Sequence, residues 1–340
     1  MEKTTLDRRR RALLRSAVGM GVAASLPFGG GRALAATAGK WPTRTVRLVV
    51  AQGAGSTGDS LMRLIAPRLE ALWKQSVVVE NRPGAGSIVG TQYVAGTNDD
   101  HTIMLATLSS VLPKFTVKNL RYDPAVDLIP IYHVMNYHIT LVASPELVKK
   151  APTLPDIIKL SQSTPGGLFF SGTGPTSIFN MMMAVVNKSL GINYTSVDFN
   201  SIPDMIMAVL RGDAQLSVAA PFNIKSQIDA GDLVPVVAFS RTRYPVLPNV
   251  PAIVEAADYK GHVPLSWGGI FGPRSLPKEA TDIVGRDVGV VLSDPIFRKD
   301  LETRLGGTVV DSSPEEFAKE YASELQMWED VVASLNITPA

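Results

Sequence analysis

The sequence predicts an α/β protein of two lobes, with mainly parallel sheets and a ligand cleft between the lobes. The chain has 340 residues, of which 45% are hydrophobic and only 19% are charged, and this is enough to build two cores. From Trp41 onward, short β-rich runs alternate with helical patterns, as in proteins with parallel sheets. Glycine-containing loops follow two of the predicted strands, and sheets of this kind bind ligands at the carboxyl ends of their strands.

The first 35 residues have the layout of an export signal. Consecutive arginines are followed by a weakly apolar run from Ala17 to Phe28 and by small-residue cleavage sites. Residues 10–15, Arg-Arg-Ala-Leu-Leu-Arg, resemble the twin-arginine motif of the pathway that exports folded proteins. The apolar run is shorter than the roughly 20 residues that span a bilayer. We therefore expect a periplasmic protein whose twin-arginine-type signal peptide, residues 1–35, is removed near Ala35 or Ala38.

The composition of the remaining chain limits its partners. Without residues 1–35 it carries 26 basic and 29 acidic side chains, a net charge of −3, so nucleic acid is not an expected partner. The chain has no cysteine, which excludes disulfides and thiolate metal sites. Its four histidines lack the spacing of a metal motif, and no Ser/His/Asp or paired-carboxylate arrangement is evident. We predict no metal site, no catalytic residues and no cofactor.

The pattern of hydrophobic residues predicts eight strands and six helices before residue 240. The strands are residues 46–51, 77–80, 102–107, 139–143, 168–171, 196–199, 215–219 and 234–239, and the helices are residues 59–74, 88–95, 154–163, 177–190, 203–211 and 223–230. Residues 121–145 are interpreted as a crossing region, and the last third of the chain is predicted to be helical. Residues 313–316, Ser-Pro-Glu-Glu, combine a capping box with proline at the first helical position, which predicts a helix to about Leu335. We place lobe 1 at residues 41–143 and 252–340, and lobe 2 at residues 144–251.

A glycine loop follows the first predicted strand and opens the first predicted helix. Its spacing, Gly53-x-Gly55-x-x-Gly58, is that of a dinucleotide fingerprint, and Glu80 stands where a ribose-binding carboxylate would be. A phosphate-binding P-loop requires lysine after its last glycine, and Asp59 follows instead. A nucleophile elbow requires glycine at position 54, which is alanine. The dinucleotide interpretation stays open as an alternative.

The same loop also suits a smaller anion. Backbone N–H groups at a helix N-terminus are unpaired, and the helix dipole favours negative charge there. Each hydrogen bond to an ionised group contributes about 1.5–3 kcal/mol, so a few of them can hold a carboxylate without arginine. A matching loop follows the strand at 168–171, and its hydroxyl groups suit helix capping and donation to a second anionic group.

Several short motifs, in order along the chain, resemble the Bug-type substrate-binding receptors of tripartite tricarboxylate transporters (TctC). The most specific motif is residues 77–86, Val-Val-Val-Glu-Asn-Arg-Pro-Gly-Ala-Gly. It is supported by Tyr-Asp-Pro at 122–124, Leu-Pro-Asn-Val-Pro at 247–251, Ser-Trp at 266–267 and Ser-Pro-Glu-Glu-Phe at 313–317. The resemblance implies a two-lobed fold like that of periplasmic binding proteins, which closes over a small carboxylate and delivers it to a membrane permease.

The resemblance places the ligand contacts in the loops at the strand ends. They are Gly53, Ala54, Gly55, Ser56, Thr57, Gly58 and Asp59 in the first loop, Thr107 and Ser109 after the third strand, Ser171, Thr173, Thr176 and Ser177 in the second lobe, and Ala219 and Phe222. The family often has Asp-Asn where this chain has Ala219-Ala220, and its first loop commonly has Pro-Pro where this chain has Gly53-Ala54. Loss of that aspartate removes the partner of a ligand ammonium group. We therefore expect a carboxylate without an amino group, either with an aromatic or apolar body near Phe222 or dicarboxylic.

These inferences predict an extracytoplasmic solute receptor for uptake or sensing, and not an enzyme. Its expected partners are a small carboxylate and either a tripartite membrane permease or a sensor protein, and we expect a monomer. The alternative is a periplasmic dinucleotide-binding oxidoreductase that uses the Gly-Ala-Gly-Ser-Thr-Gly loop at 53–58.

Overall fold

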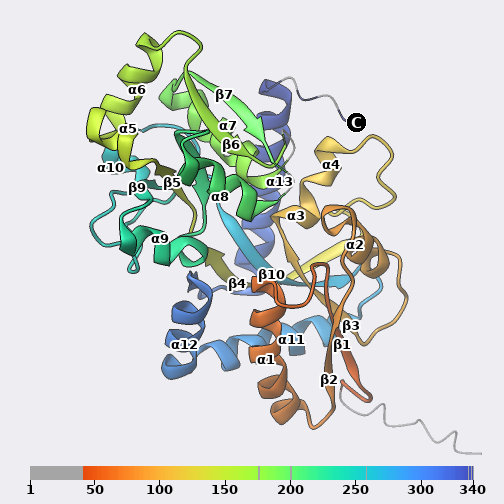
Figure 1. Cartoon of the computed structure of the whole chain (residues 1–340). Helices are drawn as coiled ribbons and strands as arrows, with labels where there is room; N and C mark the ends of the chain where they lie inside the picture. The colour runs from red at the N-terminus through yellow and green to blue at the C-terminus, as the bar shows by residue number, and fades with distance from the viewer. Residues whose placement is uncertain are drawn as a thin grey trace, which may run out of the picture. The chain divides into compact units, whose positions relative to one another are not determined.

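The computed structural model describes residues 41–340 except residues 175, 176, 200, 258, 336, 338 and 340. The predicted signal peptide and its cleavage sites lie outside the described residues. The described chain forms two β-sheets that are covered by helices, which is the two-lobed α/β fold predicted from the sequence (Figure 1). None of the helices in the described part of the chain combines the length and the hydropathy of a membrane span.

The first sheet has six strands in the order β11-β4-β10-β3-β1-β2. They are β1 Val46–Val50, β2 Val77–Asn81, β3 Thr102–Thr107, β4 Leu128–Tyr137, β10 Ser266–Pro273 and β11 Gly307–Val309. Strand β1 pairs in parallel with β2 and β3, whereas β10 is antiparallel to β3 and β4, and β11 is antiparallel to β4. Every residue of β3 and β10 is buried, because helices cover both faces of the sheet.

The second sheet has five strands in the order β7-β6-β8-β5-β9. They are β5 Thr140–Ala143, β6 Leu168–Gly172, β7 Tyr194–Asp198, β8 Leu216–Ala219 and β9 Val234–Ala238. Strand β6 is parallel to β7 and β8, and β5 is antiparallel to β8 and β9. In both sheets the parallel part is the part built from consecutive β-α units.

Three strands differ from the sequence prediction. Strand β4 lies in the predicted crossing region, and β10 and β11 lie in the third of the chain predicted to be helical. The sequence of β10, Ser-Trp-Gly-Gly-Ile-Phe-Gly-Pro, is rich in glycine and lacks the β-branched residues that mark a strand. Its place between β3 and β4, fully buried, stabilises it. Because these strands are antiparallel to their neighbours, the sheets are mixed and not mainly parallel.

Helices follow most strands, and further helices close the chain. They are α1 Thr57–Trp73, α2 Ile88–Ala95, α3 Leu108–Val111, α4 Pro113–Thr116, α5 Pro145–Lys150, α6 Leu154–Ser163, α7 Ile178–Leu190, α8 Ile202–Arg211, α9 Lys225–Ala230, α10 Ile253–Ala256, α11 Lys278–Leu292, α12 Pro295–Leu305 and α13 Pro314–Ser334, with 3₁₀ turns η1 Ala85–Ser87 and η2 Pro221–Ile224. The predicted C-terminal helix is present and begins at the predicted capping box of Ser313 and Glu316.

Each sheet separates two hydrophobic cores. In the first sheet, Leu48 and Val50 pack with α1, α11 and α12, while Val49 points to the opposite face and packs with α2 and α13. In the second sheet, Leu141 packs with α6 and α7, and Val142 packs with α8 on the other face. This alternation is the period of two that a strand imposes on its side chains. Because each sheet is packed on both faces, the ends of its strands are held in fixed positions.

Three segments connect the two sheets. His138 and Ile139 join β4 to β5, and residues 239–265 join β9 to β10. Helix α13 is the third connection, because Phe317 packs in a core of the first sheet and Trp328 packs in a core of the second (Figure 1).

The predicted lobe boundaries differ from these crossings. The boundary at residue 143 places β5 in lobe 1, but this strand pairs with β8 and β9 in the second sheet. Ile253 and Val263 also pack in the second-sheet core, although both follow the predicted return at residue 252. The crossings therefore lie at 138–139 and after residue 263. Sequence periodicity cannot place them, because a strand pattern does not say which sheet it joins.

Glu324 lies near the middle of α13, between the two cores that this helix joins. Its Oε1 accepts the indole N–H of Trp328 at 2.8 Å. Burial raises the pKa of Glu324 to about 7, and hydrogen bonds from Trp328 and Trp267 partly oppose this shift. The carboxyl group that links the two cores therefore titrates near neutral pH.

We expect Glu324→Gln to flatten the pH dependence of stability. The pKa of Glu324 is raised from 4.5 to about 7 on folding, so its contribution is fully present below pH 4.5 and is lost as the pH rises through 7. The wild type should lose about 1–3 kcal/mol relative to the variant across this window. Urea denaturation at a series of pH values measures the difference. Glu329→Gln, on an exposed position of the same helix, is the control, and parallel curves for wild type and Glu324→Gln would contradict the assignment.

Candidate functional site

Helix α1 begins with a polar cap that leaves two backbone N–H groups free. Ser56 is the N-cap residue, and its Oγ accepts the N–H of Asp59 at 3.2 Å. The N–H of Ser56 itself donates to the carbonyl of Gly53. Among the described residues, the N–H groups of Thr57 and Gly58 have no hydrogen-bond acceptor, since the first amides of a helix lack an intrahelical partner. They form a donor pair at the positive end of the helix dipole.

Two glycines at the start of α1, Gly55 in the loop and Gly58 in the first turn, are favoured for different reasons. Gly55 has a φ of +81°, which glycine adopts without strain. At Gly58 a Cβ atom would lie 2.6 Å from Oε1 of Gln52 and 2.9 Å from Cδ2 of Leu105. A side chain at position 58 would therefore require the side chains of Gln52 and Leu105 to move.

Asp59, predicted as a ligand contact, instead organises this loop. The residue is 3% exposed, its Oδ2 accepts the N–H of Gly55 at 2.9 Å, and its Oδ1 lies 2.9 Å from Nε of Arg63. Burial would raise the pKa of Asp59, but hydrogen bonds from Arg63, Gly55 and Asn81 lower it below its usual value. The carboxylate is thus ionised and its Oδ2 is occupied, so the Gly55 N–H is not available to a ligand.

Arg63 links the loop to the 77–86 motif that carries the family resemblance. Its guanidinium donates to Oδ1 of Asn81 at 2.9 Å, and Nδ2 of Asn81 donates to the carbonyl of Gln52 at 3.1 Å. Asn81 ends β2, the edge strand next to β1. Asn81 of the motif therefore holds the start of α1 in place through hydrogen bonds with Arg63 and Gln52.

Helix α7 in the second lobe begins in the same way. Ser177 is its N-cap residue, and Oγ of Ser177 accepts the N–H of Asn180 at 3.3 Å. Oδ1 of Asn180 accepts the N–H of Thr173 at 2.9 Å, which is the neutral counterpart of the contact between Asp59 and Gly55. Both loops are thus folded back on the third residue of the helix that follows.

The start of α7 also presents two amides. The N–H of Ser177 donates to the carbonyl of Gly174, but those of Ile178 and Phe179 have no acceptor among the described residues. Because the second lobe repeats the arrangement of the first, each lobe contributes one helix N-terminus with two free donors.

A chain of hydroxyl groups lies at the end of β3. Oγ1 of Thr107 is 2.8 Å from Oγ of Ser109, which is 2.9 Å from Oγ of Ser87. Ser87 has a φ of +82° in the turn that follows the 77–86 motif. This turn therefore holds the hydroxyl groups of the first lobe in place.

The starts of α1 and α7 meet at one cavity of about 430 Å³ between the two sheets. Its lining consists of Gln52, Gly55, Ser56, Thr57, Gly58, Thr107, Ser109, Tyr137, Ile139, Ile178, Phe179, Ile202, Ala220, Phe222, Asn223, Ser266, Leu305 and Gly306. None of these residues carries a charged side chain. Among the described lining residues, only helix dipoles and N–H groups therefore offer positive charge to an anion.

Some other hollows of the described chain are larger but differ in chemistry. One of about 760 Å³ lies beside α5 and the loop before β6, and one of about 540 Å³ lies between β10 and α13. In neither do the free amides of two helices meet, among the described residues. Convergence of donors, and not volume, identifies the site.

The structure gathers part of the predicted site around this cavity. The predicted residues that line it are Gly55, Ser56, Thr57, Gly58, Thr107, Ser109 and Phe222. Those that do not line it are Gly53, Ala54, Asp59, Ser171, Thr173, Ser177 and Ala219, and Thr176 lies outside the described residues. Ser171 is fully buried and bonds to the neighbouring strand β8, and Thr173 and Ser177 bond to Asn180. The hydroxyl groups of Ser171 and Ser177 and the N–H of Thr173 hold the second-lobe loop, and none of these three residues lines the cavity.

Sequence reasoning missed several lining residues. Ile178 and Phe179 follow the predicted cap Ser177 directly, so the rule that the first two helical amides are free would have found them. Leu305 and Gly306 come from the end of α12, far along the chain. Tyr137 ends a strand that was not predicted, so only the fold reveals it.

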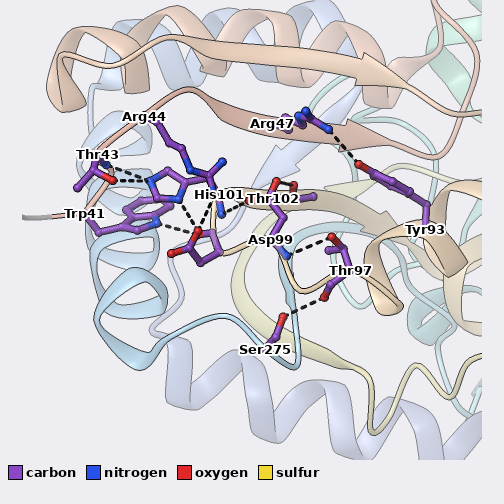
Figure 2. Close-up of polar contacts among 11 residues, drawn as sticks. Trp41, Thr43, Arg44, Arg47, Tyr93, Thr97, Asp99, His101, Thr102 and Ser275 are labelled. Carbon is purple, nitrogen blue, oxygen red and sulfur yellow. Dashed lines mark hydrogen bonds and ion pairs between the residues drawn. The ribbon is translucent and has the colours of Figure 1, made fainter. Parts of the chain in front are cut away.

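A separate polar cluster joins the beginning of the described chain to the loop before β3 (Figure 2). Atoms of Asp99, Asp100 and His101 lie within 4.8 Å of one another, as metal ligands would. Each of these side chains already has a protein partner: Asp99 bonds to Thr102 and Arg44, and His101 bonds to Asp100 and the N–H of Thr43. Burial would raise the pKa of Asp99, but hydrogen bonds from Thr102, Arg44 and the backbone N–H of His101 lower this pKa to about 2. The cluster therefore anchors Thr43 and Arg44 to the loop before β3.

Comparison with known families and proteins agrees with this geometry. The profile described as "Tripartite tricarboxylate transporter family receptor" matches residues 61–337. The protein BugT of Bordetella pertussis is 24% identical, with 89% of this chain and 92% of BugT covered. A UPF0065 protein from the tcbD–tcbE intergenic region of Pseudomonas sp. strain P51 is 24% identical, with 87% of this chain and 88% of that protein covered.

Solved structures share the fold. The periplasmic binding protein BugD is 23% identical, with a TM-score of 0.71 over 88% of this chain and 100% of BugD. An R. palustris protein solved with adipate is 26% identical, with a TM-score of 0.73 over 88% of this chain and 100% of that chain. MatC of Rhodopseudomonas palustris, solved with malate, is 25% identical, with a TM-score of 0.70 over 86% of this chain and 100% of MatC.

The role assigned to Asp59 predicts that Asp59→Ala lowers stability by about 1–3 kcal/mol, because the Gly55 N–H and Arg63 lose a buried acceptor. Arg63→Ala should lower stability by less than about 1 kcal/mol, because its side chain is half exposed. Urea denaturation of the two variants measures both effects. Equal losses would mean that the ion pair, and not the loop hydrogen bond, is the main contribution.

Proposed function

Because this chain belongs to the receptor family of the tripartite tricarboxylate transporters, we propose that it is an extracytoplasmic solute receptor that binds a small carboxylate between its two sheets. The observation that carries the proposal is the convergence of the α1 and α7 starts at one cavity. Thr57 and Gly58 from one lobe, and Ile178 and Phe179 from the other, supply amides without a partner among the described residues.

The energetics favour a carboxylate at this point. A hydrogen bond to an ionised acceptor contributes about 1.5–3 kcal/mol, so several amides and hydroxyl groups bind an anion without a basic side chain. Ser56, Thr107 and Ser109 line the same cavity and add hydroxyl donors. The family relatives solved with adipate and malate support the same ligand class.

The ligand is expected to lack an amino group. Among the described lining residues no carboxylate is present to pair with an ammonium group. The aspartate that the family often has would stand at Ala219, and the next residue, Ala220, lines the cavity together with Phe222. An unpaired ammonium group buried in this cavity would be unfavourable. Tight binding of aspartate or glutamate would contradict this part of the proposal.

The two-lobed fold suits a receptor that closes on its ligand. The lobes are joined by the short crossing at 138–139, the segment 239–265 and α13, and rotation about such connections closes a cleft. We place the protein in the periplasm, as a monomer. There it hands its ligand to a tripartite permease or presents its closed form to a sensor protein.

The geometry does not favour the dinucleotide-binding oxidoreductase. Glu80, the candidate ribose ligand, pairs with Arg82 at 2.5 Å and does not line the cavity. Asp59 accepts the N–H of Gly55, so this amide of the glycine loop is not free to hold a pyrophosphate. A thermal-shift screen of residues 36–340 against carboxylates and NAD, NADP and FAD separates the two functions, because a ligand at 100 times its Kd adds about 2.7 kcal/mol of stability.

We predict that proline at the first position of either helix weakens carboxylate binding. Thr57→Pro and Ile178→Pro each delete one N–H donor, and proline is well tolerated at this position because Ser56 and Ser177 are extended. Loss of one bond to an ionised acceptor corresponds to a Kd about 10- to 150-fold higher. Isothermal titration with the best carboxylate of the screen measures it.

Two matched variants control this experiment. Thr57→Val removes the hydroxyl group but keeps the N–H and should retain more affinity than Thr57→Pro. Lys278→Pro places proline at the first position of α11, whose residue Lys278 does not line the cavity, and should bind as the wild type does. If Thr57→Pro and Ile178→Pro both bind the carboxylate as tightly as Lys278→Pro does, the amides of α1 and α7 are excluded as the carboxylate site.

A further inference from the structure

The two walls of the cavity differ in chemistry. The first lobe contributes mostly polar groups, which are Gln52, Ser56, Thr57, Thr107, Ser109, Tyr137 and Ser266 together with the amides of α1. The second lobe and the crossing contribute mostly apolar side chains, which are Ile139, Ile178, Phe179, Ile202, Ala220 and Phe222, with Asn223 as the polar member. A ligand that fits both walls has one polar end and one apolar face.

Two of the apolar side chains are unusually open for their size. Phe222 is 48% exposed and Ile202 is 39% exposed, although both lie in a cavity between two lobes. Phe222 stands on η2 after β8, and Ile202 is the first residue of α8. Large apolar side chains that stay open to a binding cavity are available to cover an apolar ligand surface.

The charge of the cavity matches one carboxylate. Each helix N-terminus is equivalent to roughly half a positive charge, so α1 and α7 together balance about one negative charge. The described lining residues include no lysine, arginine or histidine. A second carboxylate on the ligand would be desolvated against the second-lobe wall, where Asn223 is the one polar side chain among the described lining residues.

We propose that the ligand is a monocarboxylate with an apolar body. Its carboxylate lies between the starts of α1 and α7, and its body lies against Phe222 and Ile202 of the second lobe. This rests on the proposed carboxylate binding and narrows it: a dicarboxylate, such as those bound by the solved relatives, is the poorer ligand for this chain.

Matched ligand pairs test the proposal by isothermal titration with residues 36–340. Hexanoate and adipate differ in one terminal carboxylate, as do 4-methylbenzoate and terephthalate, and malate and citrate complete the panel. The expected result is that a monocarboxylate binds at least about 10-fold more tightly than its dicarboxylate partner. Equal or tighter binding of a di- or tricarboxylate would overturn this inference and leave the carboxylate receptor standing. Absence of binding by every carboxylate would overturn both.

A variant of the apolar wall gives a second, independent readout. Phe222→Arg places a cation where the proposal puts the ligand body, so adipate should bind at least about 10-fold more tightly than to the wild type and hexanoate more weakly. Ile296→Arg, at an 82% exposed position of α12 that does not line the cavity, is the matched control and should change neither. Circular dichroism checks that both variants fold. Unchanged preference in folded Phe222→Arg would show that the ligand body does not lie on this wall.

Discussion

The backbone N–H groups in the first turn of an α-helix have no acceptor within the helix. In this chain, two helices present such unpaired N–H groups to the same cavity. The starts of α1 and α7 come from different lobes, and each leaves two such groups without a partner among the described residues. Everything else about the site follows from this constraint. The cavity needs no basic side chain to hold an anion, and the lobes must approach each other for all the donors to act together.

The caps of the two helices are alike in geometry but differ in charge. In each, a serine hydroxyl accepts the N–H of the third helical residue, whose own side chain accepts an N–H of the preceding loop. That residue is Asp59 in the first lobe and Asn180 in the second. The ionised Asp59 is balanced by Arg63 on its side away from the cavity. The first loop is therefore held by charge, and the second by neutral hydrogen bonds.

Sequence reasoning reached the parts of the fold that depend on local pattern. The two-lobed α/β fold, the first glycine loop and the C-terminal capping box at Ser313 all have short-range signals, and the structure contains each of them. It failed where tertiary packing decides. Strand β10 is stabilised by burial between β3 and β4 despite its glycines, and β5 belongs to the second sheet only because of its partners.

The same division holds for the site. Ser56 and Thr57 were predicted because a cap and a helix start are visible in sequence, and both line the cavity. Asp59 was predicted as a ligand contact, and sequence could not show that its carboxylate accepts the Gly55 N–H and lies beside Arg63, away from the cavity lining. The residues of the apolar wall come from four separate segments, and only the arrangement of the second lobe brings Ile202 near Phe222.

A crystal structure of the mature chain with its tightest carboxylate ligand tests the central claim most directly. The account predicts carboxylate oxygens within about 3 Å of backbone nitrogens at the starts of both α1 and α7. A carboxylate bound to side chains alone, or seated in the hollow between β10 and α13, would contradict it.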